Sequence, residues 1–522
     1  MKTIFILFDS LNRSALSCYG GSVPTPNFDR LAQRSAIFDT HFAGSLPCMP
    51  ARRDMQTGRL NFLHRSWGPV EPFDRCFSDQ MKKSGIYSHL VTDHYHYFED
   101  GGATYHTRYS SWEFIRGQES DPYIAMVTPP LQHFKDSYHP VQFEDNRDGH
   151  RLQGMINRTA IRSEGDYPVV KCIDRAIDFL ENNAEQDNWC LQVETFDPHE
   201  PFDAPDEFQD NDTGYTGRIL DWPRYRQLEE TEEEIAELRA RYAALVRFCD
   251  AQLGRLLDEI DARNLWQDTA IILTTDHGFL LGEHNWWAKN RMPFYNEVAH
   301  IPLMIYHPAQ QIAGGSHISA LTQTIDIMPT LLEIFSLPIP DTVTGYSLLP
   351  YLLNTETTPR HIALYGIFGG AINATDGQYS YFRYPEDMEQ HPLNEYTLMP
   401  MHNRSLFEIR ELVPAELYYG FSFTKGAPVL KIPALKDAKR SPRQGGFADT
   451  QTRLFDMRSD AGQNAPFRNK EIEAELLKAI AAEMAIHEAP DELYHRFDMA
   501  GAPNQSKRPC LHAQSSTCHQ HI

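Results

Sequence analysis

Short apolar runs alternate with segments of helical periodicity over the first two-thirds of the chain. A short apolar run bounded by polar residues is typical of a buried strand, whereas apolar residues spaced three or four apart are typical of a helix. This pattern predicts strands at 4–8, 86–92, 189–195, 270–275 and 301–306, and helices at 170–182, at 231–260 and after Pro26. Such alternation predicts an α/β fold with a mainly parallel sheet sandwiched by helices.

Two of these predicted strands are followed directly by acidic or imidazole side chains. Asp9 comes directly after the strand at 4–8, and Asp276 and His277 come directly after the strand at 270–275. Ligands of open α/β sheets bind beyond the carboxyl ends of the strands. We therefore expect two carboxylates and an imidazole to converge at one rim of the sheet.

Beyond about residue 350 the pattern changes to short strand-like pieces and long irregular stretches. The pieces lie at 361–365 and 379–384, an irregular stretch covers 436–446, and a helix is predicted at 469–486. The predicted division is an α/β catalytic domain at 1–355, a smaller C-terminal α+β domain at 356–490, and a polar tail at 491–522. We expect the tail to be disordered, because chain termini without apolar residues have little to pack.

Composition narrows the class of partner. The formal net charge is −23, and 41% of the residues are hydrophobic. A strongly acidic surface repels nucleic acids and anionic membranes, so we predict neither as a partner. No apolar stretch approaches the roughly 20 residues of a membrane-spanning helix. An anionic substrate would need a local cluster of cationic groups within this acidic chain.

The cysteines and the first residues bear on the compartment. The eight cysteines are scattered, without a Cys-x-x-Cys pair. In a chain of this length that favours free thiols and a reducing compartment. The apolar run at 4–8 is too short for a signal peptide and fits a buried strand instead. The expected location is the cytoplasm.

The most specific motif begins at Cys48. Cys48, Pro50 and Arg52 form a Cys-x-Pro-x-Arg pattern, which Thr57 and Gly58 follow. This resembles the signature of the type I, formylglycine-dependent sulfatases of the alkaline phosphatase-like superfamily. In that family a formylglycine-generating maturase oxidises the Cys, and the hydrated aldehyde is the nucleophile. One hydroxyl attacks sulfur and displaces the alcohol, and the other then loses its proton and expels sulfate, so that one hard step becomes two easier ones.

Other segments extend the resemblance from about residue 3 to residue 352. They are similar in order and spacing to sulfatase motifs and comprise 24–32, 276–284, 297–303, 324–332 and 345–350. The resemblance implies a divalent metal, with Ca²⁺ first and Mg²⁺ or Mn²⁺ as alternatives, because hard oxygen ligands suit these ions. Ser10 stands where better-known members carry a second acidic residue. The implied ligands are Asp9, Ser10, Cys48, Asp276 and His277.

The same resemblance implies the residues around the substrate. Arg52 and Lys289 match family residues that neutralise sulfate oxygens. His199, in the stretch 197–202, matches a histidine that protonates or hydrogen-bonds the leaving oxygen. Many sulfatases carry Gly-Lys-Trp-His after the strand that corresponds to 86–92. Here the Lys is missing, Asp93 stands near its place, and either His94 or His96 could supply the imidazole.

Three functions are compatible with these residues. The first is a sulfuric ester hydrolase that releases inorganic sulfate, with a sulfated carbohydrate as the preferred substrate and an aryl sulfate as the alternative. The second is a phosphonate monoester hydrolase or phosphodiesterase of the same superfamily, since both substrates are tetrahedral oxyanions. The third is a protein that binds sulfated glycans without turnover. The presence of all the residues that the chemistry needs argues against the third.

Overall fold

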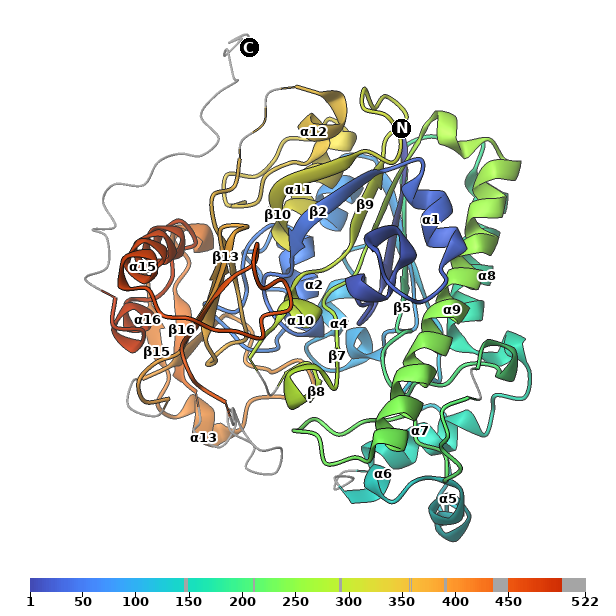
Figure 1. The fold of residues 1–522 in the computed structure, drawn as a ribbon. Helices are drawn as coiled ribbons and strands as arrows, with labels where there is room; N and C mark the ends of the chain where they lie inside the picture. Colours follow the sequence, from blue (N-terminus) through green and yellow to red (C-terminus); the bar gives the residue numbers. More distant parts are fainter. Residues whose placement is uncertain are drawn as a thin grey trace.

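The computed structural model describes residues 1–144, 149–209, 212–290, 293–355, 357, 359–388, 392–434 and 449–499. Its centre is an eight-stranded sheet with the order β10-β2-β9-β6-β1-β5-β3-β4. Figure 1 labels β10, β2, β9 and β5 of this sheet. Its strands are β1 (Lys2–Phe8), β2 (Ala36–Phe42), β3 (Tyr87–Thr92), β4 (Ser111–Phe114), β5 (Trp189–Thr195), β6 (Thr269–Thr274), β9 (Leu303–Tyr306) and β10 (His317–Gln323). All pairings are parallel except those of β9, which runs antiparallel to both neighbours. The mainly parallel sheet that the sequence predicts is thus confirmed.

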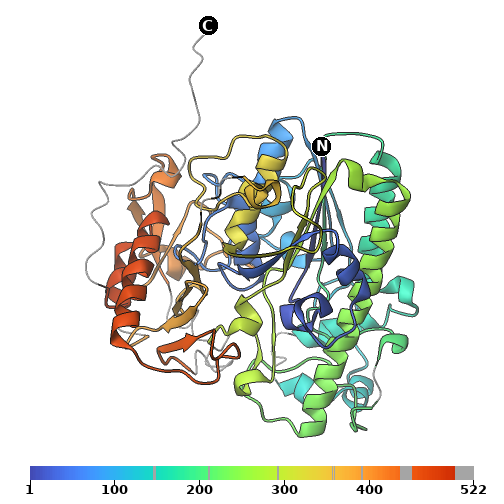
Figure 2. The same ribbon diagram turned by 45° about the horizontal axis from the view of Figure 1, so that its top comes forward.

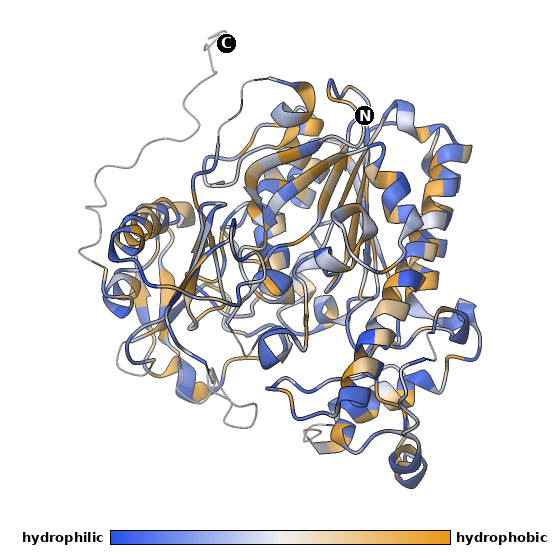
Figure 3. Ribbon diagram, viewed as in Figure 1, coloured by the Kyte–Doolittle hydropathy of each residue, from blue (hydrophilic) through white to orange (hydrophobic). Residues whose placement is uncertain are grey.

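Helices cover both faces of this sheet. Successive side chains of a strand point to opposite faces, so the apolar residues of one strand pack against helices on both sides. Ile4, Ile6 and Phe8 of β1 belong to one apolar core with α1 (Pro26–Ala32), α8 (Pro168–Asn183) and α9 (Glu232–Ala262). Phe5 and Leu7 belong to a second core with α2 (Cys48–Thr57), α3 (Phe77–Lys83) and α11 (Ile327–Ile334). Figure 3 shows the apolar colour on the sheet and on the inner sides of these helices.

Helix ends follow local sequence signals. The Thr231 hydroxyl accepts a hydrogen bond from the backbone N–H of Glu234, and the Glu234 carboxylate accepts one from the backbone N–H of Thr231, so α9 begins with a capping box. Helix α2 ends at Gly58, whose φ of 66° lies in the left-handed region that favours glycine. The Thr57-Gly58 pair of the motif is therefore the end of the helix that Cys48 begins.

The C-terminal part forms a second layer beside the first domain (Figure 2). One antiparallel sheet orders its strands β11-β12-β13-β17, and a second orders them β14-β16-β15. The strands are β11 (Ala363–Tyr365), β12 (Ile372–Thr375), β13 (Tyr379–Arg383), β14 (Asn394–Thr397), β15 (Glu416–Tyr418), β16 (Val429–Pro433) and β17 (Arg453–Asp456). Helix α15 (Lys470–Ile486) packs its Leu476, Ile480 and Met484 into the same apolar cluster as Leu364 and Ile372.

The polar tail begins later than the sequence pattern indicates. Residues Asp491–Arg496 form helix α16, and Leu493, Tyr494 and Phe497 are buried in the core of the C-terminal domain. The prediction that the tail starts at 491 is wrong for residues 491–499, because these apolar side chains complete a core formed by distant segments. Residues 500–522 and the predicted irregular stretch at 436–446 lie outside the described residues.

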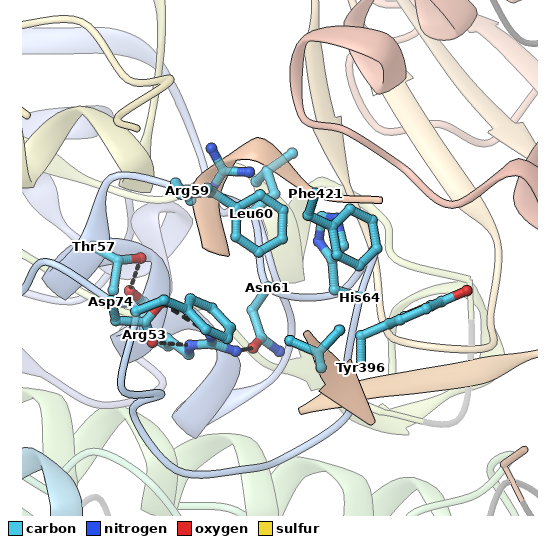
Figure 4. A pocket seen from close by; sticks show the side chains of 12 residues that line it. Arg53, Thr57, Arg59, Leu60, Asn61, His64, Asp74, Tyr396 and Phe421 are labelled. Carbon is cyan, nitrogen blue, oxygen red and sulfur yellow. Dashed lines mark hydrogen bonds and ion pairs between the residues drawn. The ribbon is translucent and has the colours of Figure 1, made fainter. Parts of the chain in front are cut away.

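A cavity lies where the end of α2 meets the C-terminal domain (Figure 4). It is lined by Arg53, Asn61, His64, Tyr396 and Phe421, among others. Arg53 already donates to Asp74 and to Asn61, so its charge is satisfied there. Cys48 begins α2, whereas the cavity adjoins the other end of that helix, so the cavity lies away from Cys48.

Two further observations concern the cysteines and the helices. The cysteines within the described part of the chain are free thiols, as their scattered positions predict. Among the described helices, none is long and apolar enough to cross a membrane.

Candidate active site

The carboxyl ends of β1 and β6 bring the predicted acidic residues together. These strands pair in parallel with Leu7 opposite Thr274, so Asp9 and Asp276 emerge side by side at one rim. Cys48, the first residue of α2, and His277 complete a group whose ligand atoms all lie within 4.8 Å of one another. All four side chains are buried. The convergence that the strand pattern predicts is present in the structure.

Arg52 lies at the centre of the buried carboxylates. Its Nη2 donates to Asp9 Oδ2 at 2.8 Å, its Nη1 to Asp276 Oδ2 at 2.6 Å, and its Nε to Glu194 Oε1 at 2.6 Å. Burial lowers the pKa of Arg52, but the three carboxylates outweigh burial and raise that pKa well above its ordinary value. The sequence assigned Arg52 to sulfate oxygens. Here its three nitrogens hold carboxylates, and only its remaining N–H groups are left for an anion.

Glu194 is a member of this network that sequence reasoning missed. It lies on β5, directly opposite Leu7 of β1. Its Oε2 accepts hydrogen bonds from Tyr97 at 3.0 Å and from Gln192 Nε2 at 2.9 Å. The available signal was a Gln and a Glu within an otherwise apolar central strand. A buried charge in such a strand needs a partner, and the partner is Arg52.

His277 is oriented by its own neighbour. Its Nδ1 donates to the carbonyl of Gly278 at 2.9 Å, so Nε2 carries a lone pair and points at Cys48 Sγ, 3.3 Å away. A Cβ on Gly278 would lie 1.9 Å from the Glu297 carbonyl oxygen, which explains the glycine after the histidine. Burial, followed by the charge of Asp9, raises the pKa of the Cys48 thiol well above its ordinary value.

Ser10 links Lys289 to the group of Asp9, Cys48, Asp276 and His277, which we call the metal-type cluster. Its hydroxyl donates to Asp9 Oδ1 at 2.7 Å and accepts from Lys289 Nζ at 3.0 Å. Its φ of 60° is unusual for a residue other than glycine, and its backbone N–H donates to Asp276 Oδ1. Ser10 lies beside the predicted metal ligand Asp9, and its own role as a metal ligand stays a prediction.

His199 lies beyond Lys289 and is flanked by two glutamates. Its Nδ1 donates to the carbonyl of Glu200 at 2.7 Å, and Lys289 Nζ lies 3.7 Å from Glu200 Oε2. His199, Glu200 and Glu119 each place a ligand atom within 4.8 Å of the others, and all three are buried. Sequence reasoning did not assign Glu119 or Glu200. Glu200 lies inside the quoted stretch 197–202, whereas nothing local marks Glu119.

The structure separates the two candidate histidines of the segment after β3. His94 is fully buried, and neither of its ring nitrogens has a hydrogen-bond partner among the described residues. His96 instead pairs through Nδ1 with Glu99 Oε2 at 2.8 Å. Asp93, near the place of the missing Lys, accepts the backbone N–H of Phe196 at 2.6 Å. The geometry thus favours His94 as the imidazole available to a substrate.

Comparison with known families decides the identity. The sulfatase family model matches residues 2–337, which is more than half of the chain. The chain belongs to the sulfatase family. A model of the C-terminal part of N-sulphoglucosamine sulphohydrolase matches residues 282–393 of this sulfatase, across the boundary between its two domains.

Named relatives agree with this assignment. N-acetylglucosamine-6-O-sulfatase from Bacteroides thetaiotaomicron is 25% identical over 68% of this chain and 71% of its own length. Iduronate 2-sulfatase from Mus musculus is 26% identical over 65% of this chain and 69% of its own length.

Solved structures share the fold. A structure in complex with its substrate D-glucosamine-2-N,6-O-disulfate gives a TM-score of 0.64 at 17% identity, covering 94% of this chain and 98% of that one. Phosphonate monoester hydrolase from Agrobacterium radiobacter gives 0.58 at 20% identity, covering 94% and 95%. At these identities the likeness establishes the alkaline phosphatase-like fold alone.

The residues present fit the divalent metal and the formylglycine that the family implies. Two buried carboxylates and an imidazole lone pair surround position 48. Such a mixed oxygen and nitrogen donor set suits a divalent cation. A cation there would also offset the buried negative charge that Arg52 alone does not balance, since three carboxylates surround one guanidinium.

Proposed function

We propose that this sulfatase releases inorganic sulfate from an O-sulfated carbohydrate, using formylglycine derived from Cys48 and a divalent metal. The observation that carries the proposal is the position of Cys48. Cys48 begins α2, faces His277, and lies close to Asp9 and Asp276. Lys289 is connected to Asp9 through the hydroxyl of Ser10. A nucleophile, a metal-type cluster and a buried cation therefore surround one point.

The metal would be held by Asp9, Asp276 and His277, with Ser10 beside them, and Ca²⁺ is the ion we propose first. When bound, it polarises the sulfate group and stabilises the developing negative charge. Formylglycine supplies a hydroxyl nucleophile at position 48 and a second hydroxyl through which sulfate is released. Arg52 holds one oxygen of each of the carboxylates of Asp9 and Asp276 before either group is present.

Lys289 and His199 supply the remaining chemistry. Burial lowers the pKa of Lys289, but Glu200 and the other acidic groups outweigh it and raise that pKa, so the ammonium stays charged and holds sulfate oxygens. Because Nδ1 of His199 is engaged with Glu200, its Nε2 is the atom that meets the leaving oxygen. Burial lowers the pKa of His199 well below its ordinary value, and a bound anionic ester opposes that shift and favours the imidazolium.

The names of the relatives support a carbohydrate substrate, since an N-acetylglucosamine-6-O-sulfatase and iduronate 2-sulfatases are among them. We further propose that a formylglycine-generating maturase modifies Cys48. The side chain of Cys48 is 2% exposed in the folded protein. The maturase would therefore act before folding is complete.

Steady-state kinetics on matched substrates test the proposal. Protein in which residue 48 is modified is assayed on sulfated monosaccharides, an aryl sulfate, an aryl phosphonate monoester and an aryl phosphodiester. We expect higher kcat/KM on sulfate monoesters, because a pocket that closes on three free oxygens has no room for a second ester arm. A preference for either phosphorus substrate would favour the phosphonate hydrolase function, and the Cys48→Ala variant gives the background rate.

A further inference from the structure

A chain of polar contacts leads away from the metal-type cluster. Ser10 bonds Lys289, Lys289 lies beside Glu200, and Glu200 adjoins His199. Glu119 lies beyond His199, at the end of this series. Under the proposed function the sulfate group occupies the first part of the series, so the last part faces the leaving alcohol.

Glu119 is held in place from several sides. Its Oε2 accepts the hydroxyl of Tyr95 at 2.6 Å, and His150 Nε2 lies 3.5 Å from its Oε1. Its φ of 45° is unusual for this residue type, and Asn157 Nδ2 donates to its carbonyl at 3.1 Å. The preceding Gln118 donates to Asp197 Oδ1 at 2.6 Å, which ties this loop to the loop that carries His199.

Two acceptor atoms of this group are open to a donor, Nε2 of His199 and Oε2 of Glu200, whereas Glu119 Oε2 already accepts from Tyr95. Nδ1 of His199 carries the ring proton toward the Glu200 carbonyl, so Nε2 of the neutral ring is an acceptor before a bound ester favours the imidazolium. Glu200 Oε2 is buried and, within the described residues, accepts no hydrogen bond. Tyr225 donates to the other oxygen of Glu200. A buried acceptor without a donor costs free energy, so these two open acceptors favour a ligand that places a hydrogen-bond donor between them.

An independent observation points to the same place. His94 comes from a different loop, is fully buried, and neither ring nitrogen has a partner among the described residues. Its ring packs 5.0 Å from Phe196, whose ring in turn lies 4.2 Å from His199. Unpaired buried nitrogens on a ring that shares its Phe196 contact with His199 indicate a polar ligand rather than a dry core.

We infer that Glu119 and Glu200 form a subsite beside His199 that binds hydrogen-bond donors of the leaving alcohol, either hydroxyl or ammonium groups, next to the sulfate ester. This inference rests on the proposed function and goes further, because it determines which saccharides are accepted. An unsubstituted sugar offers such donors. A second sulfate or a carboxylate at the same place would face the Glu119 carboxylate and be rejected.

A charge-neutral change separates this subsite from general effects on catalysis. The probes are a monosaccharide sulfate with a free hydroxyl next to the ester and its counterpart methylated at that hydroxyl. Their leaving alcohols are similarly basic, so proton delivery by His199 affects both alike. Binding is measured by calorimetry in a Cys48→Ala background, and turnover is measured with residue 48 modified.

We expect the free-hydroxyl ester to bind and react about tenfold better than the methylated one, the size of one hydrogen bond to a charged group. The Glu119→Gln variant should lose most of this preference. The control is Glu113→Gln, whose carboxylate is half-exposed at the edge strand β4 and should retain the preference. The same comparison with an amino sugar sulfate and its N-acetylated form tells an ammonium from a hydroxyl.

Three results would overturn the inference. The first is that the protein with Glu119 in place shows no preference for the free-hydroxyl ester, and the second is that the preference survives in Glu119→Gln. The third is that Glu119→Gln lowers kcat/KM for both esters equally and shifts the pH profile, which would make Glu119 a positioning residue for His199. Metal content distinguishes a further alternative, since loss of one metal equivalent in Glu119→Gln would make this group a second cation site. Absence of sulfate release by the unsubstituted protein would count against the proposed function, while the binding comparison still decides the subsite.

Discussion

The Nε atom of Arg52, on helix α2, donates a 2.6 Å hydrogen bond to Oε1 of Glu194, a residue 142 positions away on strand β5. This bond leaves the other two nitrogens of the guanidinium for Asp9 and Asp276. The orientation of both carboxylates therefore depends on a glutamate that faces no substrate. Groups that orient metal ligands through a second contact often control metal affinity as strongly as the ligands do.

Replacement of Glu194 by Gln should weaken metal binding and activity by about 10–100-fold, because Arg52 loses its anchor. Metal affinity is measured by competition with a chelator, and kcat by sulfate release. Tyr97→Phe, which removes only a contact to the other oxygen of Glu194, is the matched control and should have a smaller effect. Unchanged metal affinity in folded Glu194→Gln would contradict the assignment.

Active protein should carry formylglycine at position 48. Burial and Asp9 raise the pKa of the Cys48 thiol, so the unmodified side chain is a poor nucleophile at neutral pH. Mass spectrometry of the peptide that contains residue 48 should show a lighter species that reacts with a hydrazide. If fully active enzyme retained unmodified Cys48, another nucleophile would have to be sought.

Asp9→Ala and Asp276→Ala should each abolish turnover, and chelation should do so reversibly. Both carboxylates belong to the metal-type cluster, and Asp276 also receives the backbone N–H of His277. Asp268→Asn is the control, since that carboxylate is half-exposed at the start of β6. Full activity of dialysed enzyme in excess chelator would argue against a catalytic metal.

His94→Ala should lower kcat/KM by about a hundredfold, the cost of removing one preorganised donor from a buried site. His96→Ala should lower stability more than activity, because His96 pairs with Glu99 and packs against Trp67. Kinetics and thermal unfolding of both variants make the comparison. The reverse order of effects would assign the imidazole to His96.

The pH profile on an aryl sulfate should fall as pH rises through about 7. Burial raises the pKa of Glu200 to about 7. Below that value the carboxyl is neutral, and above it the carboxylate attracts Lys289, 3.7 Å away, and competes with sulfate. Glu200→Gln should flatten this limb of kcat/KM. A limb that persists in Glu200→Gln would show that another group titrates.

Local patterns were enough for much of the fold. The strand at 189–195 agrees with β5 at both ends, and the helix at 231–260 agrees with α9 within two residues. An apolar strand and a capped amphipathic helix are encoded by neighbours in the sequence. The positions of Asp9 and Asp276 followed in the same way, since each comes directly after such a strand.

The sequence by itself thus determined the strands β1, β3, β5, β6 and β9, the sheet rim, and the motif at Cys48. Only the tertiary structure decided that Glu194 anchors Arg52, that Glu119 adjoins His199, and that α16 belongs to the C-terminal core. The physical reason is range. Periodicity and capping act between residues a few positions apart, whereas a buried charge finds its partner through strand register and loop packing, which bring together residues far apart in the sequence.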